Sequence, residues 1–138
     1  MRRRHAPLLL ALLLPPALAA CQAPSGQAGR QGRQMPVPVV FFTEDSAFMG
    51  EQARATIAEA AELARERPNA PVTVLGFTAP PGSAGFNQAL SEARARNVAD
   101  ALVAAGVPAG RISVRPRGPV PFEMMPTESR RVEIRVGG

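Results

Sequence analysis

Hydrophobic and polar residues follow one another in blocks that predict four strands and two helices after residue 36. Runs rich in Val, Ile and Phe, which favour strands, lie at residues 37–42, 71–76, 111–115 and 130–136. Two longer segments, residues 50–67 and 90–105, repeat apolar residues at three- and four-residue steps, which predicts helices with one buried face. The order βαβαββ predicts an α+β fold: a two-layer sandwich, with both helices on one face of a mixed four-stranded sheet and a hairpin-like final pair of strands.

Two loops need separate predictions. Glu44 and Asp45 follow the first strand, where with Ser46 they supply turn and cap chemistry for the first helix. Residues 117–128 predict a long loop that contains Phe122, Met124 and Met125. We expect these apolar side chains to form a hydrophobic lid over the edge of the domain, with a soft-metal site or a sticky contact as the alternatives.

One arginine, Arg94, lies on the apolar face of the predicted second helix. Arg94 is four residues from both Leu90 and Val98, which belong to the apolar stripe. A guanidinium there must be paired or face a cleft, because removing one partner of a buried ion pair costs about 3–5 kcal/mol. Two interpretations stay open. Arg94 lies flat, with its head in solvent or on a carboxylate such as Glu133, or it faces a cleft and binds an anionic group.

The residues around Arg94 resemble the OmpA-like C-terminal domain family. The family motif runs approximately GHTD, a glycine loop, N and then LSxxRA. The chain matches it with Gly76-Phe77-Thr78-Ala79, Gly82, Asn87 and Leu90-Ser91-Glu92-Ala93-Arg94-Ala95. The NRRVE strand of the family is matched by Ser129-Arg130-Arg131-Val132-Glu133-Ile134. The resemblance covers about residues 36–137 and implies the same two-layer fold.

The resemblance also implies a function, which is peptidoglycan binding. In the family, the motif aspartate takes the ammonium of a diaminopimelate side chain, and the LSxxRA arginine takes its carboxylate. Here the arginine is Arg94, but Ala79 stands at the aspartate position and Phe77 at the histidine position. The implied site for the peptidoglycan stem peptide consists of Thr78, Ala79, Asn87, Leu90, Arg94, Arg130 and Arg131. We further expect Asn87 to cap the second helix.

The absent aspartate leaves two functional hypotheses. In the first, the protein binds peptidoglycan non-covalently and tethers the outer membrane to the cell wall. In the second, it keeps the fold as a structural or interaction subunit of an envelope assembly with a protein partner, and has lost diaminopimelate binding because the motif acid is Ala79.

The first 35 residues predict export and membrane attachment. Three arginines precede an apolar run at residues 7–18, which is typical of a secretory signal and too short to span a membrane. The following LAAC resembles a lipobox, which implies that Cys21 is the lipidated first residue of a lipoprotein. The alternative is an ordinary signal peptide that leaves Cys21 as an unpaired thiol.

These features predict three regions. We expect a lipoprotein signal peptide over residues 1–20, a lipidated N-terminus and disordered tether over 21–35, and an OmpA-like domain over 36–138. Gln22 is not the aspartate associated with inner-membrane retention, so we expect a lipid-anchored protein at the periplasmic face of the bacterial outer membrane.

The composition of the chain excludes several classes of function. Removing the signal lowers the formal charge from +5 to +2, since 13 arginines then face 11 acids, and no basic block remains for nucleic acid. After residue 20 the chain has no histidine, and Cys21 is its only cysteine. Ser-His and Cys-His catalytic sites and histidine or thiolate metal sites are therefore excluded. We expect no enzyme activity, no cofactor and no metal.

Overall fold

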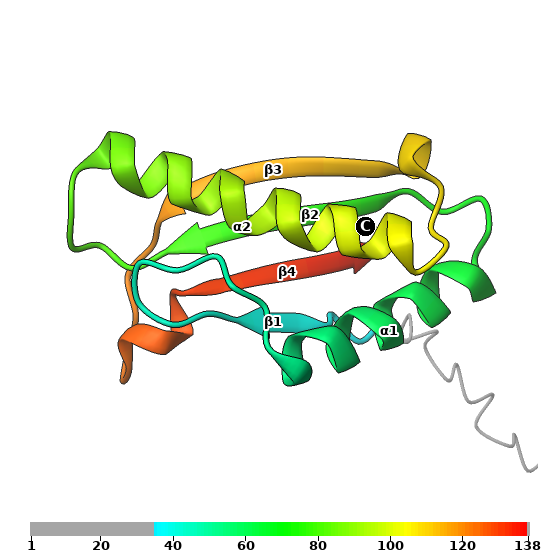
Figure 1. Cartoon of the computed structure of the whole chain (residues 1–138), viewed down its shortest axis with the longest axis horizontal. Coiled ribbons are helices and arrows are strands. Elements are labelled where there is room, and N and C mark those ends of the chain that lie inside the picture. The colour runs from blue at the N-terminus through cyan, green and yellow to red at the C-terminus, as the bar shows by residue number, and fades with distance from the viewer. Residues whose placement is uncertain (1–34, 138) are drawn as a thin grey trace, which may run out of the picture. The chain divides into compact units, whose positions relative to one another are not determined.

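The computed structural model describes residues 35–137. The predictions for the signal peptide, for Cys21 and for the tether up to residue 34 lie outside these residues. Four strands and two helices follow in the predicted order (Figure 1). The elements are β1 (Val39–Phe41), α1 (Glu51–Glu66), β2 (Val72–Thr78), α2 (Ala84–Ala104), β3 (Ile112–Pro119) and β4 (Arg131–Val136), with short 3-10 turns η1 (Ala109–Arg111) and η2 (Pro126–Glu128). Within the described part, no helix combines the length and apolarity needed to cross a membrane.

The last strand lies inside the sheet, so the predicted hairpin-like pairing of the final two strands is wrong. The strand order is β1-β4-β2-β3. β4 runs antiparallel to both β1 and β2, whereas β2 and β3 are parallel. β3 carries Pro116 and Pro119, which have no N–H to donate and suit an edge strand. The loop after β3 therefore takes the chain past the end of β2, and β4 fills the central position between β1 and β2.

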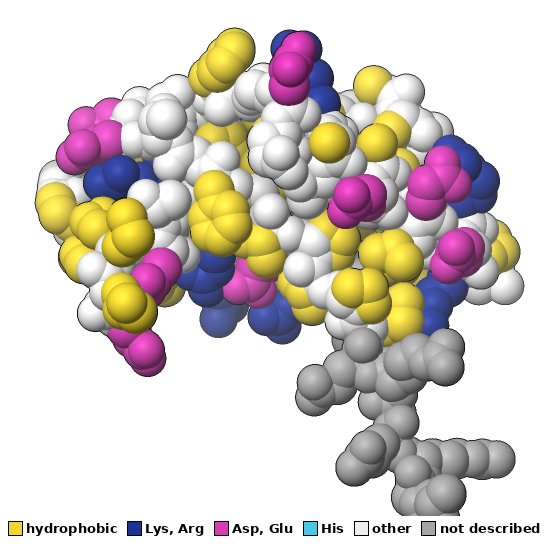
Figure 2. Space-filling view, turned by 90° about the horizontal axis from the view of Figure 1, so that it is seen from below, with side chains coloured by type: hydrophobic (Ala, Val, Ile, Leu, Met, Phe, Trp, Pro, Cys, Tyr) yellow, Lys and Arg dark blue, Asp and Glu magenta, His cyan; other side chains and the backbone are white. Residues whose placement is uncertain are grey.

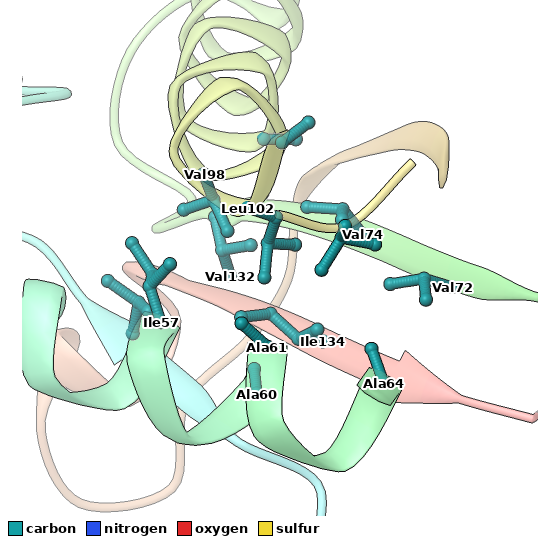
Figure 3. Close-up of a cluster of buried hydrophobic side chains, with 14 of the residues drawn as sticks. Ile57, Ala60, Ala61, Ala64, Val72, Val74, Val98, Leu102, Val132 and Ile134 are labelled. Carbon is teal, nitrogen blue, oxygen red and sulfur yellow. The ribbon is translucent and has the colours of Figure 1, made fainter. Parts of the chain in front are cut away.

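Both helices cover one face of the sheet, as predicted (Figure 1). Figure 3 shows the core between the two layers, where branched side chains of β2, β4 and α2 meet the small side chains of α1. The buried set labelled there comprises Ile57, Ala60, Ala61, Ala64, Val72, Val74, Val98, Leu102, Val132 and Ile134. The alanines bring the backbone of α1 close to the sheet, because they add little bulk between the two layers.

A close contact between α2 and β2 depends on Gly76. A Cβ built at this position would overlap the carbonyl oxygen of Ser91 and would lie 2.9 Å from its carbonyl carbon and 3.1 Å from the Cβ of Ala95. Only glycine leaves room for such an approach of one backbone to another. Gly76 thereby seats the first half of α2 over the end of β2.

The opposite face of the sheet carries a ladder of charges along β4. Glu133 accepts hydrogen bonds from Arg131 at 2.9 Å and from Arg135 at 2.8 Å. The guanidinium of Arg131 also lies over the ring of Phe77, 4.2 Å from its centre. Burial alone would raise the pKa of Glu133, but the hydrogen bonds from Arg135 and Arg131 outweigh it, and the pKa is lowered from its ordinary value of 4.5.

The lowered pKa of Glu133 predicts a loss of stability in acid. A carboxyl group with a lower pKa in the folded state stabilises that state above the unfolded pKa, and the contribution disappears as the pH falls through the folded pKa. We expect Glu133→Gln to lower the free energy of unfolding at pH 7, and the difference from wild type to shrink below about pH 4. Urea unfolding of both proteins from pH 7 to pH 3 measures it. A difference that stays constant with pH would show that the charge is not its source.

Candidate functional site

The head of Arg94 is held by backbone carbonyl groups. Arg94 is 1% exposed, so it is fully buried. Nε donates to the carbonyl of Ser46 at 2.8 Å, one terminal nitrogen to that of Thr43 at 2.9 Å, and the other to that of Phe77 at 3.2 Å. Arg94 thus links the β1–α1 loop to the end of β2.

Among the described residues, Arg94 forms no ion pair with a carboxylate. The predicted alternatives of a head in solvent or a bond to Glu133 are therefore wrong, since Glu133 lies between Arg131 and Arg135. A sequence pattern does not reveal backbone acceptors that come from 48 and 51 residues away.

Arg94 keeps its charge at neutral pH. Burial lowers the pKa of its guanidinium to about 10, with a smaller lowering by Arg130 and an opposing effect of Asp45. A guanidinium has five N–H groups, and three of them donate to the carbonyls named above. One N–H on each terminal nitrogen has no acceptor within the described residues. The guanidinium is therefore a cation with two N–H groups that no described residue accepts.

A small surface pocket lies beside this cation, and we call it the Arg94 pocket. It is lined by Glu44, Asp45, Thr78, Ala79, Pro81, Asn87, Leu90, Arg94 and Arg130. The structure thus brings together Thr78, Ala79, Asn87, Leu90, Arg94 and Arg130 of the predicted site. Its cavity of about 20 Å³ has room for little more than about one water molecule. The end of a single polar group fits, and the rest of a ligand would lie at the surface.

Arg131 is the predicted site residue that lies elsewhere. Its side chain stacks on Phe77 on the face of the sheet that the helices leave open, and it is bonded to Glu133 and to the carbonyl of Glu128. Arg130 is the residue before β4, and its side chain goes to the pocket whereas that of Arg131 goes to the open face of the sheet. Only Arg130 lines the pocket, where it lies 3.7 Å from Glu44.

Thr78 and Asn87 shape the pocket in different ways. Thr78 is 1% exposed, and its hydroxyl has no hydrogen-bond partner in the described part of the chain. The amide of Asn87 donates to the carbonyl of Pro81 at 3.1 Å, which fixes the loop between β2 and α2. Asn87 does not cap α2, because the helix begins at Ala84 and Ser83 is its cap, accepting the N–H of Phe86 at 3.2 Å.

Sequence reasoning missed the two acids of the pocket. Glu44 and Asp45 do form a turn, but α1 begins after Gly50, which provides no side-chain cap, so the predicted cap role is wrong. Both β1 and β2 run antiparallel to β4, so they run parallel to each other. Their C-terminal ends therefore lie at the same end of the sheet. That topology brings the β1–α1 loop beside residues 78 and 79, and it follows only from the strand order.

The loop before β4 does not form the predicted lid. Met124 and Met125 are 84% and 61% exposed, and Figure 2 shows hydrophobic side chains gathered at the surface of the end where this loop lies. Glu128 organises the loop by accepting the N–H groups of Glu123, Met124 and Met125 at 3.1–3.4 Å. Between residues 35 and 137, no three His, Cys, Asp or Glu side chains are grouped to hold a metal ion.

Known proteins share both this sequence and this fold. The probable lipoprotein YiaD of Escherichia coli is 36% identical in an alignment of 101 residues that covers 69% of this chain and 46% of YiaD. Outer membrane protein A of Serratia odorifera is 57% identical over 47 residues, 34% of this chain and 19% of that protein. The chain thus spans less than half the length of these two relatives.

A solved structure agrees with the fold. The peptidoglycan-associated lipoprotein from Burkholderia pseudomallei superposes with a TM-score of 0.67 at 24% identity, over 72% of this chain and 89% of the other. The sequence model of the OmpA family matches residues 41–130, which include the Arg94 pocket. The chain therefore belongs to the OmpA family.

Proposed function

We propose that this protein is an outer-membrane lipoprotein that binds peptidoglycan non-covalently through the Arg94 pocket and so tethers the membrane to the cell wall. The observation that carries the proposal is a buried guanidinium without a carboxylate partner, held at the wall of a surface pocket. Attachment would be through a lipid on Cys21, at the periplasmic face of the outer membrane.

The chemistry of the pocket suits a carboxylate of a stem peptide. The unused N–H groups of Arg94 are donors for a carboxylate, and charge-assisted hydrogen bonds of this kind are roughly twice as strong as neutral ones. Arg130 adds a second positive charge at the rim. Because Arg94 is fixed by three carbonyls, little side-chain freedom is lost when a ligand binds. The residues that would act are binding groups, which fits a protein without catalytic function.

Membership of the OmpA family and likeness to two lipoproteins support the same proposal. One of those lipoproteins is described as peptidoglycan-associated. The LAAC sequence before residue 22 adds a lipidation signal to a domain of that kind.

A second function is favoured by two observations. Ala79 lines the pocket without offering an acceptor side chain, while Phe122, Met124 and Met125 leave apolar surface on the β3–β4 loop. Both features suit a structural subunit that contacts another envelope protein and has lost diaminopimelate binding.

Co-sedimentation with purified sacculi tests the first function. We expect the full chain, solubilised in a mild detergent, to sediment with sacculi, and Arg130→Gln to weaken this binding about fivefold, which corresponds to about 1 kcal/mol. Arg135→Gln is the matched control, since Arg135 is an arginine of β4 on the open face of the sheet. We expect it to bind like wild type. Failure of the wild-type protein to sediment at any salt concentration would favour the second function.

A further inference from the structure

We propose that Asp45 supplies the acid that Ala79 lacks, so that the Arg94 pocket recognises a zwitterionic group with an ammonium and a carboxylate side by side. This inference rests on the proposed function and adds the residue that would receive the ammonium in this chain. The acid comes from the β1–α1 loop instead of the β2–α2 loop.

Arg94 itself fixes the position of Asp45. Its guanidinium bonds the carbonyl of Thr43 at 2.9 Å and that of Ser46 at 2.8 Å. These two residues bracket the turn that contains Glu44 and Asp45. The cation in the wall of the pocket therefore holds the acidic turn at the rim of the same pocket, and both acids are lining residues.

Of the two acids that line the pocket, Asp45 is the one that can accept a hydrogen bond from a ligand. Glu44 lies 3.7 Å from Arg130, whereas Asp45 has no ion pair or side-chain hydrogen bond to another described residue. Its backbone has a φ of 48°, in the left-handed region. Asp and Asn tolerate this conformation better than other residues with a side chain, although it still costs free energy. A carboxylate is thus presented to solvent on a constrained turn.

The unpartnered hydroxyl of Thr78 is a separate indication of a ligand. A buried polar group without a hydrogen bond costs about 1–3 kcal/mol, and most such groups in proteins have a partner. The Oγ1 of Thr78 is buried without one inside the described region, and Thr78 lines the pocket. A ligand group entering beside Arg94 would provide that partner.

The balance of charge selects the class of ligand. The pocket is lined by two arginines and two acids, with Arg94 and Asp45 free of ion pairs within residues 35–137. A simple anion would meet the acids as well as the arginines, and like charges brought together reduce affinity. A group with adjacent ammonium and carboxylate matches both signs. The amino-acid end of a diaminopimelate side chain is such a group.

The test compares native sacculi that contain diaminopimelate with sacculi whose free amines have been acetylated. The full chain is used in detergent as wild type, Asp45→Asn and Asp100→Asn. Asparagine keeps the tolerance for the left-handed backbone and removes only the charge. Asp100 is an exposed acid on α2 and serves as the matched control.

We expect Asp45→Asn to bind native sacculi about tenfold more weakly than wild type, and acetylation to weaken wild type by a similar factor. Acetylation should then have little further effect on Asp45→Asn, and Asp100→Asn should behave like wild type. Adding Ala79→Asp to Asp45→Asn should recover binding to native sacculi, because it returns a carboxylate to the pocket wall.

Two outcomes separate this inference from the proposed function. If wild type binds native sacculi but Asp45→Asn binds them equally well, or is weakened equally on both preparations, Asp45 does not receive an ammonium and the inference fails while peptidoglycan binding stands. If wild type binds neither preparation, the proposed function fails and the inference falls with it.

Discussion

Arg94→Ala is expected to lower the free energy of unfolding by about 3–5 kcal/mol. Arg94 is the largest side chain that is fully buried in the described residues, so its truncation leaves a cavity. The carbonyls of Ser46, Thr43 and Phe77 would also lose their hydrogen-bond donor. Urea unfolding of the full chain at neutral pH measures the loss.

Arg96→Ala is the control for that experiment. Arg96 lies two residues further along the same helix, and its exposed guanidinium pairs with Glu92 at 2.6 Å. We expect a change below about 0.5 kcal/mol, because exposed pairs on a helix contribute little. Arg94→Lys should lie between the two, since one ammonium cannot reach three carbonyls arranged around a planar group. Equal stability of Arg94→Ala and Arg96→Ala would contradict the structural role of Arg94.

The structural role of Arg94 also changes how binding experiments are interpreted. Loss of binding in Arg94→Ala would combine lost ligand contacts with a loosened β1–α1 loop, because the same side chain holds that loop. Variants of Arg130 and Asp45, which line the pocket without such bonds to the core, separate recognition from folding.

Gly76→Ala is expected to cost about 3 kcal/mol of unfolding free energy, at the upper end of overpacking effects. The added methyl group would overlap the Ser91 carbonyl, which is backbone within α2 and has no rotamer through which to escape. The helix must move away from β2, and this displaces Arg94 from the carbonyl of Phe77. Thermal unfolding followed by circular dichroism should show a lower melting temperature.

Gly85→Ala provides a control for which we expect the opposite change in the free energy of unfolding. Gly85 lies in the first turn of α2, and a Cβ there would meet nothing within 4 Å. Alanine favours the helix over glycine, so we expect a gain of about 0.5 kcal/mol. If Gly76→Ala were as stable as wild type, the close approach of α2 to β2 would not be a constraint on the fold.

The number and kind of elements follow from local pattern, and so does the inward direction of Arg94. Leu90, Arg94 and Val98 share one face at four-residue spacing whatever the helix packs against. The order of the strands in the sheet does not follow from local pattern. The alternation of apolar and polar residues along β4 would be the same if β4 lay beside β3 instead of between β1 and β2. The error about the final pair of strands has this origin.

The site shows the same division between local and long-range information. Thr78, Asn87 and Leu90 lie close together in sequence around one loop and one helix, and the motif places them together. Asp45 reaches the pocket only because β1 and β2 end at the same edge, separated by β4. The acceptors of Arg94 are peptide carbonyls, which every residue has, so no residue type marks them.

The central position of β4 has a consequence for how the protein acquires its structure. β1 pairs only with β4, so the earliest strand of the domain has no neighbour until the latest strand arrives. The sheet is therefore completed by contacts between distant parts of the polypeptide, and such topologies fold slowly. Until residues 131–136 are available, β1 has no strand to pair with and the sheet of the described domain stays incomplete.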